Sequence, residues 1–279
     1  SPGTERMVVQ FANKSLAGKA KARPDLVKKV IAKSKTDGIA ATFKAVMSRL
    51  EDPLPLGYSA AGVVIEIGND LEGLFRVGDR VAIAGAGFAN HADINAVPRN
   101  LAAHIPDKVS DEQACYGTVS AIALHAVRNL QSSLGDFVAV VGLGLIGQLA
   151  CQFLRLAGIR VIALDYNEER LDTAKRNGAE LATNLQIPDL TNRVMSQTSG
   201  RGCDGILIAA ATNSSDPFET AANIARDRAK ICLVGASGTE FPYSVFMQKE
   251  LSIVVSRSYG PGRYDEEYER RGVKYPEGF

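Results

Sequence analysis

The chain has 279 residues, a length that suggests one large domain or two of ordinary size. Hydrophobic residues make up 46% of it and charged residues 23%, which is typical of a folded globular protein and excludes a disordered chain. The formal net charge of +1 gives no strong field that would recruit nucleic acid or an anionic membrane, so we expect neither as a partner.

The four cysteines are spread along the chain, and no two of them have the spacing of a metal knuckle or a redox pair. Cys151, Cys203 and Cys232 lie in or beside apolar segments, so we expect them to be buried, reduced thiols. Reduced thiols favour a cytoplasmic location. The longest apolar runs are too short to cross a bilayer, and no signal peptide is visible.

Residues 1–117 are predicted to form a β-rich module. Short apolar runs at 63–67 and 80–84 are separated by glycine- and aspartate-containing turns, a pattern typical of small barrels. Two helices interrupt the module at about residues 24–50. The first begins at Pro24 and ends at Gly38, and the second carries an apolar periodicity from 39 to 50. The basic residues between the apolar positions are predicted to form a solvated face rather than a phosphate site.

From residue 118 to 256 the pattern changes to alternating strands and helices. Strands are predicted at 137–141, 160–164, 205–211 and 229–234, and helices at 146–157, around 171–175 and at 218–225. Near-continuous apolar strands that alternate with helices indicate a parallel sheet covered on both faces. We therefore predict an α/β fold with a doubly wound parallel Rossmann sheet.

A glycine motif follows the first of these strands. Gly142, Gly144 and Gly147 form GxGxxG between a strand and a helix, the context that this fingerprint requires. Gly142 permits a tight turn, Gly144 allows backbone to approach a pyrophosphate, and Gly147 lets the helix pack against the strand. Leu145 and Ile146 open the helix, whose N–H groups favour an anion.

Asp165 ends the next strand, at the distance at which a dinucleotide site carries its acidic residue. A carboxylate there accepts hydrogen bonds from ribose hydroxyls and repels a 2′-phosphate, which favours NAD over NADP. The topology places Ala211, Thr212 and Gly235 beside the cofactor, because ligands lie across the carboxyl ends of the strands. Arg170 either covers the adenine or is a solvated helix residue.

The order of these modules resembles the medium-chain dehydrogenase/reductase superfamily, the alcohol dehydrogenase-like enzymes. The resemblance rests on 57–68, on the turn and strand at 77–81, and on the GLGLIG sequence, and it covers nearly the whole chain. It implies that the β-rich module is GroES-like and that the protein is a cytoplasmic NAD(H)-dependent oxidoreductase acting on a small-molecule substrate. It allows a homodimer formed through the edge of the Rossmann sheet.

The zinc ligands of that superfamily are missing at the matching positions. Pro2 stands where the first cysteine is expected, and Gly57-Tyr58-Ser59 matches a Gly-His-Glu motif. The second-domain cysteine aligns best near Thr118, with Cys115 close by, and the four-cysteine cluster for structural zinc is absent. The resemblance, with these substitutions, predicts no metal.

A narrower resemblance lies at both ends, in residues 1–6 and 257–279. These segments are similar to a zinc-less branch in which the dehydrogenase-like half is fused to a glucose–fructose oxidoreductase-like half. We therefore expect that the N-terminal module is incomplete, that 257–279 leads into a further portion of chain, and that such a fused domain is a partner.

Without zinc, a carbonyl or alkoxide requires hydrogen-bond donors and a proton from a side chain. Tyr58 and Ser59 occupy the place of the zinc-binding histidine, and Tyr58 is either the general acid or a packed wall residue. Thr118 either contacts the nicotinamide or substrate or caps a helix. His91 either relays a proton or is a surface residue.

Arg257, Arg263 and Tyr264 form a polar cluster after the last strand. It either binds an acidic or phosphorylated substrate or anchors a fused domain.

The sequence therefore predicts a zinc-independent NAD(H) oxidoreductase for a small alcohol or carbonyl, with a sugar derivative suggested by the fused-domain resemblance. Two alternatives remain. One is a non-catalytic dinucleotide-binding module, and the other is a quinone-reductase-like enzyme, whose usual preference for NADP conflicts with Asp165.

Overall fold

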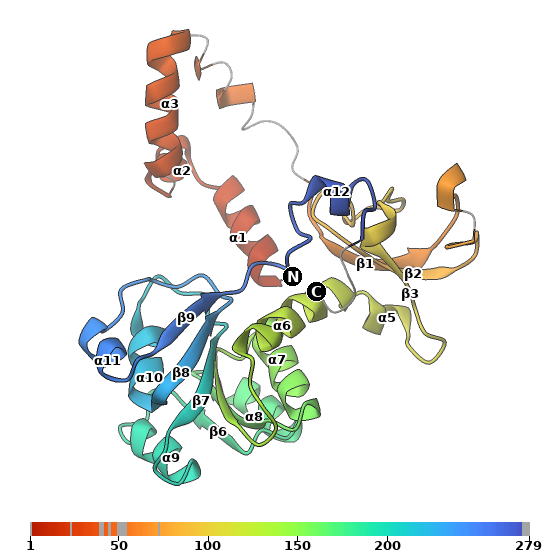
Figure 1. Ribbon diagram of the computed structural model, residues 1–279. Coiled ribbons are helices and arrows are strands. Elements are labelled where there is room, and N and C mark those ends of the chain that lie inside the picture. Colours follow the sequence, from red (N-terminus) through yellow and green to blue (C-terminus); the bar gives the residue numbers. More distant parts are fainter. Residues whose placement is uncertain are drawn as a thin grey trace.

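The computed structural model describes residues 2–22, 24–38, 42–43, 46–48, 55–71 and 73–274. It contains a six-stranded sheet with helices on both faces and a separate three-stranded sheet (Figure 1). A group of helices near the N-terminus projects away from both sheets. Among the described residues, no helix has both the length and the apolar character needed to cross a membrane.

The large sheet is entirely parallel, with the strand order β6-β5-β4-β7-β8-β9. Its strands are β4 (Phe137–Val141), β5 (Arg160–Asp165), β6 (Leu181–Asn184), β7 (Cys203–Ile208), β8 (Ala225–Leu233) and β9 (Ser252–Val255). Its helices are α6 (Gly117–Leu130), α7 (Leu145–Leu156), α8 (Glu168–Arg176), α9 (Leu190–Gln197), α10 (Asp216–Ile224) and α11 (Tyr243–Gln248). In chain order the strands run 3-2-1-4-5-6, the order of a Rossmann sheet. The predicted fold class is confirmed.

The central strand β4 shows why these strands are apolar without alternation. Val138 and Val140 pack into the core on one face of the sheet, whereas Phe137, Ala139 and Val141 pack into the core on the other. All five residues are buried because helices cover both faces. The strand order reverses between β4 and β7, which places a ligand crevice at their carboxyl ends.

The small sheet is antiparallel, with β2 (Arg80–Ala84) between β1 (Ser59–Val63) and β3 (Ala102–His104). Two 3-10 helices, η1 (Asn69–Leu71) and η2 (Arg99–Leu101), lie in its connections, and α5 (Asp111–Ala114) leads into α6. The predicted strand at 80–84 is confirmed.

The predicted strand at 63–67 is wrong, because the strand lies at 59–63. β1 stops pairing with β2 after Val63, because the segment just before β2 turns there. Gly78 N–H donates to the Val64 carbonyl at 2.8 Å, and among the described residues the ladder does not continue beyond this point. The paired residues are Ser, Ala, Ala, Gly and Val, which carry little of the β-branched signal that marks strands.

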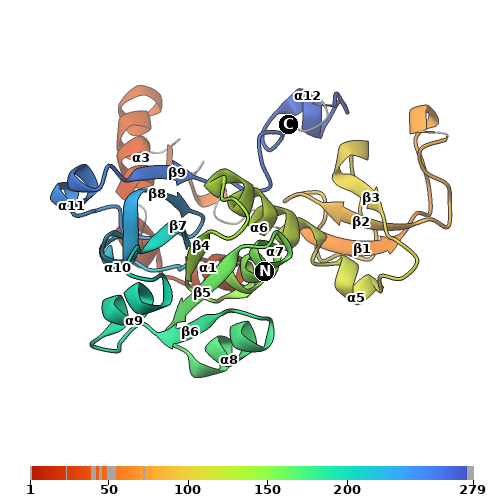
Figure 2. The same ribbon diagram turned by 60° about the horizontal axis from the view of Figure 1, so that its bottom comes forward.

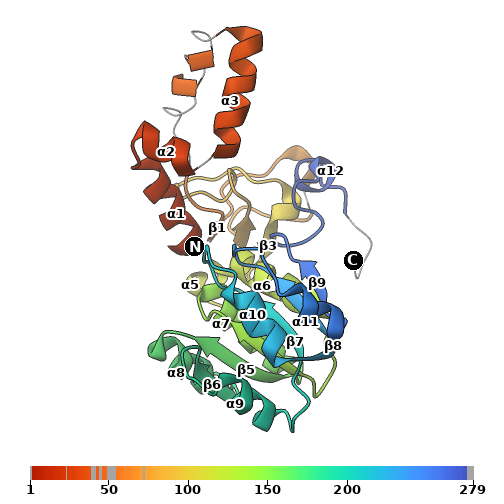
Figure 3. The same cartoon turned by 90° about the vertical axis from the view of Figure 1, so that its left-hand side faces the viewer.

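Three helices form the projecting group: α1 (Pro2–Ala12), α2 (Leu16–Ala22) and α3 (Pro24–Asp37) (Figures 1 and 3). α3 begins at the predicted proline, whereas α1 and α2 were not predicted. Its lysines are exposed, as expected of a solvated face: Lys28, Lys29, Lys33 and Lys35. The second predicted helix, 39–50, falls partly outside the described residues, and 42–43 and 46–48 are helical.

After β9 the chain crosses to the small sheet, where α12 (Glu266–Glu269) lies (Figure 2). Asn100 Nδ2 donates to the Tyr268 carbonyl at 2.9 Å, and Arg99 Nε donates to the Gly272 carbonyl at 3.1 Å. Residues 256–274, called the C-terminal segment below, therefore tie the Rossmann unit to the small sheet.

Candidate cofactor and active site

Two glycines of the motif are required by the protein itself. Gly142 has a φ of 93°, and a Cβ there would lie 2.7 Å from the backbone nitrogen of Ala210. A Cβ on Gly147 would lie 2.0 Å from the Gly142 carbonyl oxygen. Any side chain would force the turn away from β7 or the helix away from the turn.

Gly144 differs, because a Cβ there would meet no atom within 4 Å. Its φ of −67° is accessible to any residue, and it forms the N-cap of the 12-residue helix α7. No described residue lies close enough to explain why this residue lacks a side chain. The open space lies at the helix N-terminus, where free N–H groups of residues such as Leu145 and Ile146 favour an anion.

Asp165 is held rigidly beside this loop and is only 6% exposed. Its Oδ2 accepts a hydrogen bond from Leu143 N–H at 2.6 Å, and its Oδ1 accepts one from Asn167 N–H at 2.9 Å. Arg170 Nη1 lies 3.5 Å from Oδ2, with half of its side chain exposed. The carboxylate therefore bridges the glycine loop and the start of α8, at the carboxyl end of β5.

The ends of β7 and β8 meet at the same edge of the sheet. A Cβ on Gly235 would lie 2.0 Å from the Ala210 carbonyl oxygen, and Thr212 N–H donates to the Ala236 carbonyl at 2.9 Å. The structure thus brings Ala211, Thr212 and Gly235 to the crevice edge, and their contact with a cofactor stays a prediction.

Ser256 was not identified from the sequence. It follows β9 and is 5% exposed, its N–H donates to the Leu233 carbonyl at 2.9 Å, and its buried Oγ has no hydrogen-bond partner. An unsatisfied buried hydroxyl is costly and needs an explanation, and an ordered water or a polar ligand group can supply it. The only signal in the sequence was its position after the last strand of the sheet.

These features fit a dinucleotide. The space at Gly144 suits a pyrophosphate, the fixed carboxylate of Asp165 suits ribose hydroxyls, and the orphaned hydroxyl of Ser256 lies at the same edge of the sheet.

Ser59 and Thr118 are brought together, but both hydroxyls are hydrogen-bonded to backbone groups. Ser59 Oγ donates to the Cys115 carbonyl at 2.6 Å and accepts from Thr118 N–H at 3.2 Å. The buried Thr118 hydroxyl donates to the Ile83 carbonyl at 3.4 Å. Thr118 lies within α6, whose N-cap is Tyr116, so it is not the cap. Both residues fasten α6 to the small sheet.

Tyr58 and His91 have different surroundings. Tyr58 is half-buried, and its carbonyl accepts from Gly85 N–H at 3.0 Å. The side chain of His91 is 68% exposed, and its Nε2 lies 2.6 Å from Glu5 Oε1, so it joins its loop to α1. The geometry places His91 in a surface hydrogen bond with Glu5, whereas its predicted relay role stays a prediction.

The donor set does not fit zinc. No cluster of three or more histidine, cysteine or acidic side chains with metal-binding spacing occurs among the residues that the structure describes. The cysteines are free, and burial raises the pKa of the Cys151 and Cys203 thiols to about 12. These two thiols are protonated at neutral pH and make poor ligands.

The chain matches the family model "Zinc-binding dehydrogenase" over residues 146–271, a range that begins in the glycine motif and omits the positions of the missing zinc ligands. Sorbitol dehydrogenase from Halalkalibacterium halodurans is 29% identical over 247 residues, covering 76% of this chain and 71% of that protein. D-guloside 3-dehydrogenase from Escherichia coli is 36% identical over 154 residues, covering 54% of this chain and 43% of that protein.

Solved structures of dehydrogenases and reductases also superpose on this chain. An Escherichia coli alcohol dehydrogenase complexed with NADH superposes with a TM-score of 0.63 at 30% identity, covering 73% of this chain and 68% of that one. A quinone oxidoreductase from Pseudomonas syringae superposes with a TM-score of 0.65 at 24% identity, which shows a shared fold, and this chain spans 65% of its length. The chain belongs to the medium-chain dehydrogenase/reductase superfamily and is an oxidoreductase of that superfamily.

Proposed function

We propose that the protein is a zinc-independent, NAD(H)-dependent oxidoreductase that interconverts a small alcohol and its carbonyl, with polyols and sugar derivatives as the favoured substrates. The observation that carries the proposal is the buried carboxylate of Asp165, fixed between the glycine loop and α8.

The position of Asp165 supports NAD(H) over NADP(H) as the cofactor. Its Oδ2 is already anchored by Leu143 N–H, so the carboxylate cannot swing away to admit a 2′-phosphate. Placing a second anion against it would cost binding energy in a poorly solvated site. Ribose hydroxyls would instead donate to it, and Arg170, whose Nη1 lies 3.5 Å from Oδ2, would cover the adenine.

The remaining residues of the proposed site would bind and orient the cofactor and the substrate. The N–H groups at the start of α7 would hold the pyrophosphate, and the Ser256 hydroxyl would satisfy a polar group at the nicotinamide end. When bound, the nicotinamide supplies or accepts the hydride. Tyr58 is our candidate for moving the accompanying proton, because the Ser59 hydroxyl beside it is committed to the Cys115 carbonyl.

Zinc independence is supported by the missing ligands. Tyr58 stands at the histidine position, and Pro2 stands at the first cysteine position. Without imidazole and thiolate there, the carbonyl must be polarised by hydrogen-bond donors. Stoichiometric zinc in the purified protein, measured by elemental analysis, would overturn this part of the proposal.

The substrate class is supported by the relatives, two of which are named for sorbitol and a D-guloside. As partner we propose a second copy of the chain at β9, the edge strand of the large sheet, where Ile253 and Val255 are exposed. We propose a cytoplasmic location on the basis of the free, buried thiols.

Hydride transfer is the direct test. NADH absorbance would be followed with a panel of alcohols, aldehydes, polyols and sugars, in wild type and in Tyr58→Phe. We expect turnover with a member of the panel, and a loss of about 100-fold or more in kcat in the variant with unchanged NADH affinity. Tight NADH binding without turnover of any panel member would instead favour a non-catalytic dinucleotide-binding module.

A further inference from the structure

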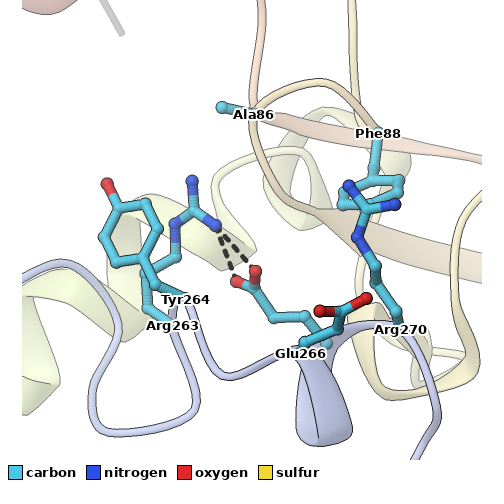
Figure 4. Close-up of a pocket in the computed structure, with 7 residues that line it drawn as sticks. Ala86, Phe88, Arg263, Tyr264, Glu266 and Arg270 are labelled. Atoms are coloured by element: carbon cyan, nitrogen blue, oxygen red, sulfur yellow. Dashed lines mark hydrogen bonds and ion pairs between the residues drawn. The ribbon is translucent and has the colours of Figure 1, made fainter.

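A pocket outside the cofactor crevice lies between the C-terminal segment and the loop that follows β2 (Figure 4). It has a volume of about 420 Å³, which is within the range of small-molecule sites. Its lining residues are Ala86, Phe88, Arg263, Tyr264, Glu266, Glu269 and Arg270.

Both walls of the pocket are connected along the chain to residues of the proposed active site. On one side, Gly85 N–H donates to the Tyr58 carbonyl at 3.0 Å, and Phe88 N–H donates to the Gly85 carbonyl at 3.1 Å. On the other side, the chain runs from Ser256, at the end of β9, directly into Arg263 and Tyr264. The two walls are thus joined through the backbone to Tyr58 and Ser256, two residues of the proposed site.

The charges at one side of the pocket are neutralised within the protein. Arg263 Nη1 donates to both oxygens of Glu269 at 2.8 Å, and the two side chains are 15% and 9% exposed. Tyr259 Oη also donates to Glu269, and burial together with this hydrogen bond raises the pKa of Tyr259. This cluster holds the wall in shape and offers a ligand no net charge.

The other charged groups remain available. Within the described part of the chain, the Glu266 carboxylate and the Arg270 guanidinium take part in no ion pair, and both residues are exposed. In Figure 4 the Arg270 side chain extends toward Phe88, and its guanidinium carbon lies 5.8 Å from the ring centroid. The pocket therefore offers one carboxylate acceptor and one guanidinium donor, with no net charge between them.

Tyr264 supplies an aromatic surface. Its side chain is 64% exposed, and the guanidinium carbons of Arg257 and Arg263 lie 4.5 Å and 3.7 Å from its ring centroid. Its φ of 68° is unfavourable for a residue with a large side chain, and such conformations cluster at ligand sites. Two residues of the sequence-predicted polar cluster, Arg263 and Tyr264, thus line this pocket, and the third, Arg257, packs against Tyr264.

We propose that this pocket binds the non-reacting part of the substrate, and that this part is an uncharged polyhydroxylated chain or ring. Hydroxyl groups both donate and accept, so they match a carboxylate and a guanidinium at once. The C–H face of a sugar packs against an aromatic ring, as Tyr264 offers. A phosphate would be attracted by Arg270 but repelled by Glu266, so balanced charge favours a neutral ligand. The proposal rests on the proposed oxidoreductase function for the reacting end of the substrate.

The test measures ligand binding separately from turnover. Neutral hexitols and methyl hexosides, and the corresponding hexitol phosphates, would be titrated by calorimetry into NADH-loaded protein. The pocket variants are Glu266→Gln and Arg270→Met. The matched controls are Glu267→Gln and Arg271→Met, neighbours that pair with each other outside the pocket. NADH affinity of every variant would be followed by fluorescence.

We expect a neutral compound to bind, each pocket variant to weaken it by about 10-fold or more, as expected when a hydrogen bond to a charged group is lost, and the controls to stay within about 2-fold. NADH affinity should not change. The proposal is overturned if no neutral compound binds, if phosphates bind more tightly, or if pocket and control variants behave alike. Failure of NADH binding or of hydride transfer would instead count against the proposed function, because sugar binding is read directly.

Discussion

At the residue scale, Gly144 distinguishes the requirements of folding from those of ligand binding, because neither packing nor backbone conformation requires its missing side chain. A Cβ there meets no atom within 4 Å, whereas one on Gly147 lies 2.0 Å from the Gly142 carbonyl oxygen. Gly144→Ala should still fold, with only the small loss in Tm expected of a poorer N-cap, and bind NADH at least about 10-fold more weakly, because a methyl group would occupy the place proposed for the pyrophosphate. Fluorescence titration and thermal unfolding measure the two effects.

Gly147→Ala and Gly62→Ala are the matched variants. The first should be strongly destabilised, because it forces the start of α7 away from the loop. The second also has open space around its Cβ but lies in the small sheet, and it should change neither property. Unchanged NADH binding in Gly144→Ala would show that the cofactor does not approach this residue.

A substitution at Ser256 also distinguishes an effect on stability from an effect on cofactor binding. Ser256→Ala removes a buried hydroxyl that has no partner in the protein, so the Tm should stay the same or rise. NADH affinity should fall about 2- to 10-fold, the effect of one neutral hydrogen bond of roughly 0.5–1.4 kcal/mol. Ser252→Ala, at the exposed opposite end of β9, is the control. Equal NADH affinity in wild type and Ser256→Ala would remove Ser256 from the cofactor site.

The residues of the dinucleotide motif and Ser256 differ in how well the sequence predicts them. Gly142, Gly147 and Asp165 are defined by local backbone geometry and by their spacing from neighbouring strands, so the motif alone identifies them. Ser256 is identified only in the folded structure, where its hydroxyl has no hydrogen-bond partner. That information depends on residues distant in sequence and has no local pattern.

At the scale of elements, the ion pair between β5 and the residue that precedes β6 predicts how stability depends on pH. Arg160 Nη2 lies 2.8 Å from Glu180 Oε2, and the hydrogen bonds from Arg160 hold the pKa of Glu180 below its ordinary value. A carboxyl whose pKa is lower in the folded state stabilises the fold above its unfolded pKa of about 4.3. The contribution is lost as pH falls through the lower, folded pKa.

Glu180→Gln should therefore reduce the free energy of unfolding at pH 7 by no more than about 1 kcal/mol, because both side chains are more than a third exposed. The difference from wild type should disappear in acid, below the folded pKa. Urea unfolding at several pH values measures it, with Arg160→Gln and the double variant completing a cycle. A difference that persists unchanged in acid would show that the effect is not electrostatic.

Elements of the Rossmann unit were more predictable than those of the small sheet. β4 and β5 have both faces buried, and α7 between them has one apolar stripe, so all three give strong periodic signals. β1 is built from serine, alanine and glycine and pairs because β2 and its turn are nearby, not because of its own propensity. A sequence pattern therefore placed it four residues too late.

At the scale of the whole molecule, the C-terminal segment connects the cofactor crevice to the small sheet. It leaves β9 at Ser256, forms the pocket wall at Arg263 and Tyr264, and is fastened by Arg99 and Asn100. The sequence identified the polar residues of this segment but not the surface they face, because the contacting residues are separated by about 170 positions.

The central claim is that this molecule uses NAD(H), and the ratio of its dissociation constants for NADPH and NADH tests it most directly. Both constants are obtained by titrating the cofactors against the purified wild-type protein under identical salt and pH. Because Asp165 is anchored and buried at the proposed ribose site, where it would repel a 2′-phosphate, we predict that NADH binds at least about 10-fold more tightly than NADPH. Equal affinity, or tighter binding of NADPH, would contradict the account and favour a quinone-reductase-like enzyme.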